Sequence, residues 1–123
     1  KVERIDTNMA EESSDRTILS MWSAPRSLST VVFFAFAQLP ECKLWDEPLM
    51  AYYFKKHNLP AFEEWNEYVN SDANDKEKRL NSIFNTEYGK KIHYIKNMCF
   101  QWEDIEQEYF NKMTHAFLIR SPE

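Results

Sequence analysis

The fold is decided by the stretch Ser20-Met21-Trp22-Ser23-Ala24-Pro25-Arg26-Ser27-Leu28-Ser29-Thr30. This stretch continues a short apolar run, Thr17–Trp22, whose length and low charge suit a buried β-strand. It leads into a second apolar run, Val31–Leu39, which follows hydroxyl residues and stops at Pro40, as a helix does. We expect this second run to be a helix that is buried on most sides, although its β-branched and aromatic content leaves a strand as the alternative.

The polar centre of the stretch is typical of a loop that binds an anion. Arg26 supplies one cation, and hydroxyls follow closely at Ser27, Ser29 and Thr30. Backbone N–H groups of such a loop, and the N-terminus of the next helix, bind phosphate-like groups. The loop has no glycine and lacks the G-x-x-x-x-G-K-[ST] spacing, so it is not a Walker A P-loop. On these residues alone, an ordinary helix capped by Ser29 or Thr30 beside a solvated arginine explains the pattern equally well.

Length and composition indicate one small folded domain. The chain has 123 residues, of which 43% are hydrophobic and 15% aromatic, enough for a packed core. A net charge of −5 argues against a general nucleic-acid surface but allows one basic pocket. The spacing of Cys42 and Cys99 fits neither a metal site nor a disulfide framework, which favours a reducing, cytoplasmic setting. No apolar run has transmembrane length, and a targeting segment ahead of Lys1 would lie outside this sequence.

Short apolar runs and helical patterns alternate along the rest of the chain. We expect a flexible arm over residues 1–16, which are mostly polar and charged, and turns at Asn70–Asp75 and Gly89. Further strands are predicted over Cys42–Trp45, Lys91–Lys96 and Ala116–Ile119. Further helices are predicted from Pro48 behind an acidic cap, from Pro60, over Lys76–Phe84 and over Trp102–Met113.

This alternation predicts an α/β fold with a largely parallel sheet. Polar segments follow the predicted strands at residues 23–30, 46–47, 96–97 and 120–121. Ligands bind outside the carboxyl ends of parallel strands. We therefore expect the four segments to converge on one edge of the sheet and to form a site there.

Three side chains in these segments each have a functional and a structural interpretation. Glu47 is a candidate general base for a hydroxyl, or else a helix cap, which is the better interpretation for its neighbour Asp46. Lys96 is a candidate for stabilising charge on a transferred group, or else a surface lysine, which is the commoner case. Arg120 has the same two interpretations, and its guanidinium suits bidentate binding of phosphate.

Four blocks of the sequence, in order, resemble the P-loop-fold sulfotransferases. The blocks are Trp22–Thr30, in the Trp-Ser-x-Pro-Arg-Ser-x-Ser-Thr form, Asp46–Tyr53 with its Asp-Glu-Pro start, Ile95–Met98 and Phe117–Pro122. Four blocks at plausible spacing are more specific than any one of them, and the resemblance covers residues 17–123. It implies a three-layer P-loop NTPase-like fold with a mainly parallel sheet, of which this chain would be the truncated N-terminal part.

The resemblance also implies a chemistry, which is transfer of a sulfuryl group from 3′-phosphoadenylyl sulfate (PAPS) to a hydroxyl of a small molecule or protein, without a metal. Glu47 is similar in position to the catalytic base of the tyrosylprotein sulfotransferases, and Lys96 to the strand lysine that meets the sulfuryl group. By the same resemblance Arg120 would bind the 3′-phosphate. The 5′-phosphosulfate would be bound by Arg26, Ser27, Leu28, Ser29 and Thr30.

Two departures from the family pattern leave an alternative open. Met98 stands where the cytosolic sulfotransferases have a catalytic histidine, and the rest of the family domain would lie beyond Glu123. The alternative is a non-catalytic sulfotransferase-fold module, a binding or assembly subunit completed by a partner chain or by the C-terminal half of the domain. A nucleotide kinase of related fold is a third hypothesis, which the missing Gly-Lys-[Ser/Thr] signature opposes.

Overall fold

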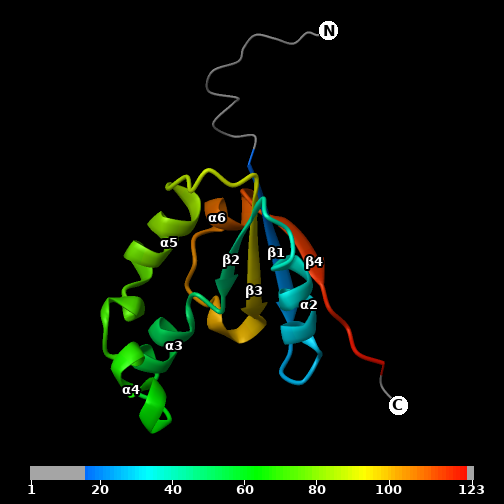
Figure 1. The fold of residues 1–123 in the computed structure, drawn as a ribbon. Helices are drawn as coiled ribbons and strands as arrows, with labels where there is room; N and C mark the ends of the chain where they lie inside the picture. The colour runs from blue at the N-terminus through cyan, green and yellow to red at the C-terminus, as the bar shows by residue number, and fades with distance from the viewer. Residues whose placement is uncertain (1–15, 122–123) are drawn as a thin grey trace, which may run out of the picture.

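The computed structural model describes residues 16–121 and shows an α/β fold built on a four-stranded, all-parallel sheet (Figure 1). In spatial order the strands are β2 (Cys42–Asp46), β3 (Ile92–Met98), β1 (Thr17–Ser23) and β4 (Thr114–Phe117). This confirms the predicted fold class. The predicted arm over residues 1–16 lies outside the described residues except for Arg16, whose guanidinium donates 2.7 Å hydrogen bonds to the carbonyls of Phe84 and Thr86.

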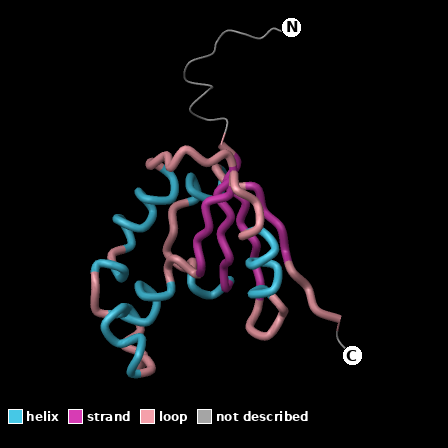
Figure 2. Tube along the Cα trace, viewed as in Figure 1, coloured by secondary structure: helices cyan, strands magenta, loops and turns pink. Residues whose placement is uncertain are grey.

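The parallel register brings the carboxyl ends of the strands to one edge of the sheet. Trp22 lies beside both Asn97 and Phe117, and Asp46 lies beside Lys96. The segments that follow these residues therefore start from a common edge, where the loop after β1 can be followed in Figure 2. This is the edge at which the four polar segments were predicted to converge, and the parallel register is the reason that they start there.

Helices cover both faces of the sheet. On one face, α2 (Ser29–Phe36) places the rings of Phe33 and Phe36 against Tyr94 of β3, with centroids 6.2 and 4.1 Å apart. The other face, on which the neighbouring Ile95 lies, packs against α5 (Lys76–Phe84). The remaining described elements are α3 (Met50–Lys56), α4 (Glu63–Val69), α6 (Gln107–Asn111) and the short 3₁₀ turns η1 (Asp72–Asn74) and η2 (Cys99–Gln101). No helix within residues 16–121 is long and apolar enough to cross a membrane.

The hydrophobic core lies between the sheet and α5. Ile95 of β3 and Leu80 and Ile83 of α5 have no exposed surface, and each such burial stabilises the fold by about 1.5–3 kcal/mol. The helix has the bounds predicted for it, because the Asp75 carboxylate caps its start by accepting a 3.1 Å hydrogen bond from the N–H of Lys78.

The helix α2 confirms the choice of helix over strand, but it differs from the prediction in length and burial. It ends at Phe36, before the predicted end, and Ser29 alone among its residues is buried. Val31 and Phe34 keep 63% and 60% of their surface exposed. A helix that lies on a sheet buries the side facing the sheet, which here carries Phe33, and none of the described elements covers the opposite side.

The helix α3 begins later than predicted. Glu47 adopts a left-handed φ of 45° and places Pro48 in a turn ahead of the helix, which starts at Met50. Its N-cap residue is Leu49, whose side chain forms no capping hydrogen bond. The predicted acidic cap is therefore wrong, because the acidic residues lie before the turn and not at the helix start.

Two other helices are also shorter than predicted. α4 begins at Glu63 and not at Pro60, since the backbone of Phe62 is still extended. The predicted helix over Trp102–Met113 reduces to α6, because Asp104 has a left-handed φ of 58° that a continuous helix cannot contain. The apolar residues between Trp102 and Met113, whose spacing predicted one helix, thus belong to a turn followed by a short helix.

The strands shift slightly from their predicted bounds. β4 covers Thr114–Phe117 instead of Ala116–Ile119, because these residues pair with 19–22 of β1. β3 covers Ile92–Met98, and its residues 93–98 are all buried in spite of the alternating apolar and polar pattern. The reason is position, since a central parallel strand is covered on both faces.

Candidate functional site

The loop after β1 turns without glycine by placing two other residues in the left-handed region. Arg26 has a φ of 64° and Leu28 a φ of 66°, a conformation that costs an L-residue about 1–2 kcal/mol. Between them, Ser27 is buried, and its hydroxyl donates a 2.6 Å hydrogen bond to the carbonyl of Ala24. Loops in which left-handed residues alternate with others turn successive N–H groups toward one concave side, where an anion binds.

The start of α2 follows this turn directly. Its N-cap residue is Leu28, with no capping side chain, and the Leu28 carbonyl accepts hydrogen bonds from Val31 and Val32 at 3.1 and 3.3 Å. The predicted cap by Ser29 or Thr30 is wrong, because both residues already lie inside the first turn. The N–H groups that begin α2 therefore lack a capping side chain of the described residues and suit an anion.

Arg120 reaches the same loop from the segment after β4. Its Nη1 donates a 3.3 Å hydrogen bond to the carbonyl of Arg26. The N–H of Leu118 donates a 2.8 Å hydrogen bond to the carbonyl of Trp22, which continues the pairing with β1. A cavity of about 690 Å³ lies between the two segments, with residues 26–28 on one side and residues 118–121 on the other.

This cavity brings together most of the residues predicted to bind the donor. Ser29 and Thr30 do not line it, since the first is buried in α2 and the second is exposed elsewhere on the helix. The residues that line it carry two guanidinium groups and no carboxylate, so the cavity is locally positive in a chain of net charge −5. The predicted residues that do line it are Arg26, Ser27, Leu28 and Arg120.

Lys96, near the end of β3, is buried beside two carboxylates. Its side chain is 7% exposed, and its Nζ lies 3.1 Å from Oε2 of Glu47 and 3.2 Å from Oδ1 of Asp46. Burial by itself lowers the pKa of the Lys96 ammonium, but the hydrogen bond to Glu47 and the charge of Asp46 outweigh burial and raise this pKa above its ordinary value. The interpretation of Lys96 as a surface lysine is therefore wrong.

Glu47 is held by its backbone and its side chain together. Its N–H donates a 2.9 Å hydrogen bond to the carbonyl of Lys96. Its Oε2 accepts from Lys96, and its Oε1 accepts a 3.0 Å hydrogen bond from Nε2 of Gln101. Neither Glu47 nor Asp46 caps α3, so the cap interpretation is wrong for both. The side chain of Glu47 keeps 20% of its surface exposed, so an oriented carboxylate reaches the surface beside a buried cation.

Gln101 is the member of this cluster that the sequence analysis missed. It lies in η2, the turn directly after β3, and is 2% exposed. Its residue type does not distinguish it from an exposed glutamine. What could have identified Gln101 is its position, because it is a polar residue that follows Lys96 closely, at the edge of the sheet where the parallel strands end.

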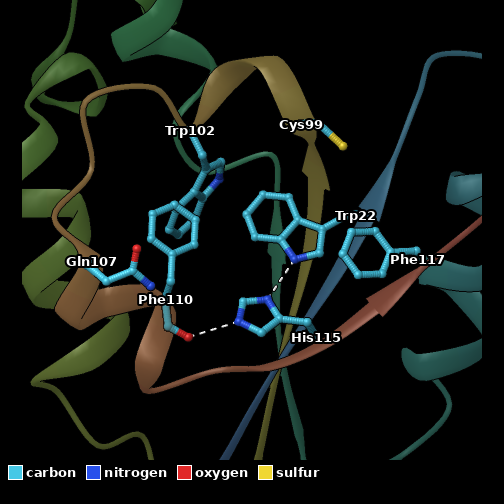
Figure 3. Close-up of a pocket in the computed structure, with 7 residues that line it drawn as sticks. All are labelled: Trp22, Cys99, Trp102, Gln107, Phe110, His115 and Phe117. Carbon is cyan, nitrogen blue, oxygen red and sulfur yellow. Dashed lines mark hydrogen bonds between the residues drawn. The ribbon is translucent and has the colours of Figure 1, made fainter.

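A second cavity, of about 480 Å³, opens beside Trp22 (Figure 3). Nε1 of Trp22 donates a 2.8 Å hydrogen bond to Nδ1 of His115, whose Nε2 lies 2.8 Å from the carbonyl of Phe110. In this arrangement Nδ1 accepts and Nε2 donates, so both ring nitrogens of His115 are engaged. Trp102 packs edge-on against Trp22 with centroids 5.6 Å apart. The walls of this cavity are thus mainly aromatic, and we assign His115 a packing role.

Neither cavity shows a metal centre. Across the part of the chain that the structure describes, no three or more His, Cys, Asp or Glu side chains gather closely enough to hold a metal ion. The thiols of Cys42 and Cys99 are both free. That the chemistry runs without a metal stays a prediction.

Comparison with known proteins identifies the family. The chain matches the family described as "Sulfotransferase domain" over residues 17–123. It therefore belongs to the sulfotransferase-domain family, as the four sequence blocks predicted. The parallel sheet with helices on both faces is consistent with a P-loop-like sulfotransferase fold.

Two curated relatives from Arabidopsis thaliana are similar to this chain. Branched-chain-amino-acid aminotransferase-like protein 2 is 31% identical over 106 residues, and Branched-chain-amino-acid aminotransferase-like protein 1 is 30% identical over 106 residues. Each alignment covers 85% of this chain and 19% of the relative. The chain thus spans about a fifth of the length of the curated relatives it matches. No solved structure matches the chain.

Proposed function

We propose that this chain carries the donor-binding loop and the catalytic pair of a PAPS-dependent sulfotransferase that acts on a hydroxyl acceptor. The observation that carries the proposal is the cavity between the loop after β1 and the segment after β4. Arg26 and Arg120 line it from opposite sides, and the start of α2 lies beside them. Its volume of about 690 Å³ suits a ligand of nucleotide size.

The donor has two anionic groups, a 5′-phosphosulfate and a 3′-phosphate, which need separate cationic partners. In this proposal Arg26 and the N–H groups of Ser27 and Leu28, which line the cavity, hold the phosphosulfate, and the N-terminus of α2 beside them favours its negative charge. Arg120 holds the 3′-phosphate through its planar guanidinium. The hydrogen bond from Arg120 to the Arg26 carbonyl keeps both groups on one cavity.

Glu47 and Lys96 supply the groups for the transfer, and the donor supplies the sulfuryl group. Glu47 accepts the proton of the acceptor hydroxyl, whose oxygen forms a bond to sulfur while the bond from sulfur to the phosphate oxygen breaks. Lys96 stabilises the negative charge on the transferred group. An ammonium has three N–H donors, and the carboxylates of Asp46 and Glu47 engage two of them in the described residues, which leaves one for the sulfuryl group.

The acceptor in this proposal is a hydroxyl of a small molecule or of a protein. The exposed part of Glu47 leaves the base within reach of a group that arrives from solvent. A reducing, cytoplasmic setting belongs to the same proposal, and the free thiols of Cys42 and Cys99 are compatible with it.

Calorimetric titration with 3′,5′-ADP, the spent donor, tests the donor site. We expect the purified protein to bind it and Arg26→Ala to weaken binding about tenfold or more, because a hydrogen bond to a charged group contributes about 1.5–3 kcal/mol. Lys91→Ala is the matched control, since it removes a positive charge from an exposed residue at the opposite end of β3. No binding by the wild-type protein, or binding unchanged by Arg26→Ala, contradicts the donor site.

The 3′-phosphate contact has its own test in the same titration. We expect Arg120→Ala to weaken 3′,5′-ADP binding while leaving the weaker binding of 5′-AMP unchanged. Equal losses for both nucleotides would mean that Arg120 does not contact the 3′-phosphate.

Exposed apolar side chains on the loop, α2 and the β4 side favour a second candidate function, that of a non-catalytic binding or assembly module. Such surfaces mark contacts between proteins. In this candidate a partner chain or a C-terminal half of the domain covers them. Stable association in analytical ultracentrifugation together with no binding of 3′,5′-ADP would favour this candidate over the enzyme. The exposed apolar side chains on the loop, α2 and the β4 side, each at least 60% exposed, are Leu28, Val31, Phe34, Phe117 and Ile119.

A further inference from the structure

The carboxylate of Glu47 is held from two sides by groups of different chemistry. Lys96 reaches it from β3, and Gln101 reaches it from η2, while Asp46 on β2 shares the ammonium of Lys96. These are the charged and hydrogen-bonding side chains that the described elements bring to this cluster. Gln101 is its one neutral member, and it is 2% exposed.

The orientation of the Gln101 amide follows from its partner. An ionised carboxylate accepts hydrogen bonds and cannot donate them, so the NH₂ end of the amide must face Oε1 of Glu47. The other end, Oε1 of Gln101, is buried and has no hydrogen-bond partner among the described residues. Burial of an unpaired amide oxygen is unfavourable, and an apolar side chain of similar shape would avoid it.

We propose that Gln101 is a positioning residue for Glu47, one that matches both protonation states of the carboxyl group. While Glu47 is ionised, the Gln101 NH₂ donates to it. Once Glu47 has taken the acceptor proton, a turn of the amide presents Oε1, which accepts the new O–H. Lys96 has no acceptor and serves the ionised state alone. The inference deepens the proposed function and rests on it for the source of the proton.

The direct test compares the carbon-13 NMR resonance of the Glu47 carboxyl group near neutral pH in the wild-type protein and in Gln101→Met. Methionine has a similar length and volume, so the buried site stays filled. We expect this resonance to move in Gln101→Met, because the ionised carboxylate loses the hydrogen bond from the Gln101 NH₂. Gln107→Met is the control, since Gln107 is exposed and its amide donates to Asn111. An unchanged Glu47 resonance overturns the inference.

Sulfuryl transfer supplies the second readout. We expect Gln101→Met to lower kcat about ten- to hundredfold with the KM for the donor and the affinity for 3′,5′-ADP unchanged. Gln101→Glu keeps the acceptor oxygens but removes the NH₂, and it should lower kcat as well. If 3′,5′-ADP does not bind the wild-type protein but the Glu47 resonance moves in Gln101→Met, the proposed function fails and the positioning of Glu47 stands. Transfer by Gln101→Met at the wild-type rate contradicts the role of Gln101 in turnover.

Discussion

Replacement of Lys96 by methionine tests the central electrostatic feature of this protein. Methionine keeps the length of the side chain and leaves no cavity, so the change removes the ammonium alone. The carboxylates of Glu47 and Asp46 then lose the cation that lies 3.1 and 3.2 Å away. Removing one partner of a fully buried ion pair costs about 3–5 kcal/mol.

The exposure of the two carboxylates reduces this figure. The side chain of Glu47 is 20% exposed and that of Asp46 is 57% exposed, so water replaces part of what the ammonium supplied. We therefore expect Lys96→Met to lower the free energy of unfolding by about 2 kcal/mol and the melting temperature by about 10 °C. The double variant Lys96→Met/Glu47→Gln should be more stable than Lys96→Met, because it leaves no uncompensated charge at Glu47.

The pH dependence of this difference has a defined sign. The pKa of Lys96 is raised above its ordinary value of 10.5 in the folded state. Its contribution is thus fully present below the unfolded-state pKa and is lost as the pH rises through the higher folded-state pKa. We expect a constant gap between wild type and Lys96→Met near neutral pH, and a gap that closes in strongly alkaline solution.

Urea denaturation followed by tryptophan fluorescence measures these stabilities. Lys91→Met is the matched control, since it removes a positive charge from an exposed residue that precedes the same strand. Equal urea midpoints for Lys96→Met and the wild-type protein would refute the reasoning, because Lys96 would then behave as a solvated lysine. A double variant less stable than Lys96→Met would refute the account of the uncompensated carboxylate.

Two further predictions concern residues outside this pair. Burial lowers the pKa of His93 from 6.5 to about 4. Because the unfolded state binds the proton first, the wild-type protein should lose up to roughly 3 kcal/mol of stability as the pH falls from 6.5 to about 4. The variant His93→Gln should lack that loss when the two proteins are compared by acid titration of the circular dichroism signal. Leu28 is 73% exposed and has a left-handed φ of 66°. Because glycine adopts this φ freely and little burial is lost, Leu28→Gly should stabilise the fold by about 0.5–1 kcal/mol in urea denaturation. A variant less stable than the wild-type protein would contradict backbone strain at Leu28.

Local patterns account for the parts of the fold that could be predicted. The helix over Lys76–Phe84 was predictable because its cap and apolar face lie within one short segment. β1 was predictable because a short apolar run followed by a polar loop is typical of a buried strand. By contrast, the bounds of α3 and α6 depend on left-handed residues at Glu47 and Asp104, which their residue types do not indicate.

The residues of the candidate site also fall into those that could be predicted from the sequence and those that could not. The loop with Arg26, and Arg120 after β4, could be found from sequence because both follow strands of a parallel sheet. The burial of Lys96 could not, since a lysine at a strand end is more often exposed. The contact of Gln101 with Glu47 was also hidden, because the two residues lie 54 positions apart.

The sequence by itself determined the α/β class, the parallel sheet and the edge at which the polar segments meet. These features follow from the lengths of apolar runs and from the rule that parallel strands end on one side. Only the tertiary structure decided which polar side chains are buried and which pair. The pairing of β2 with β3 places Asp46 beside Lys96 and brings Glu47 and Gln101 together, and removal from water then favours contact between opposite charges and hydrogen-bonding partners.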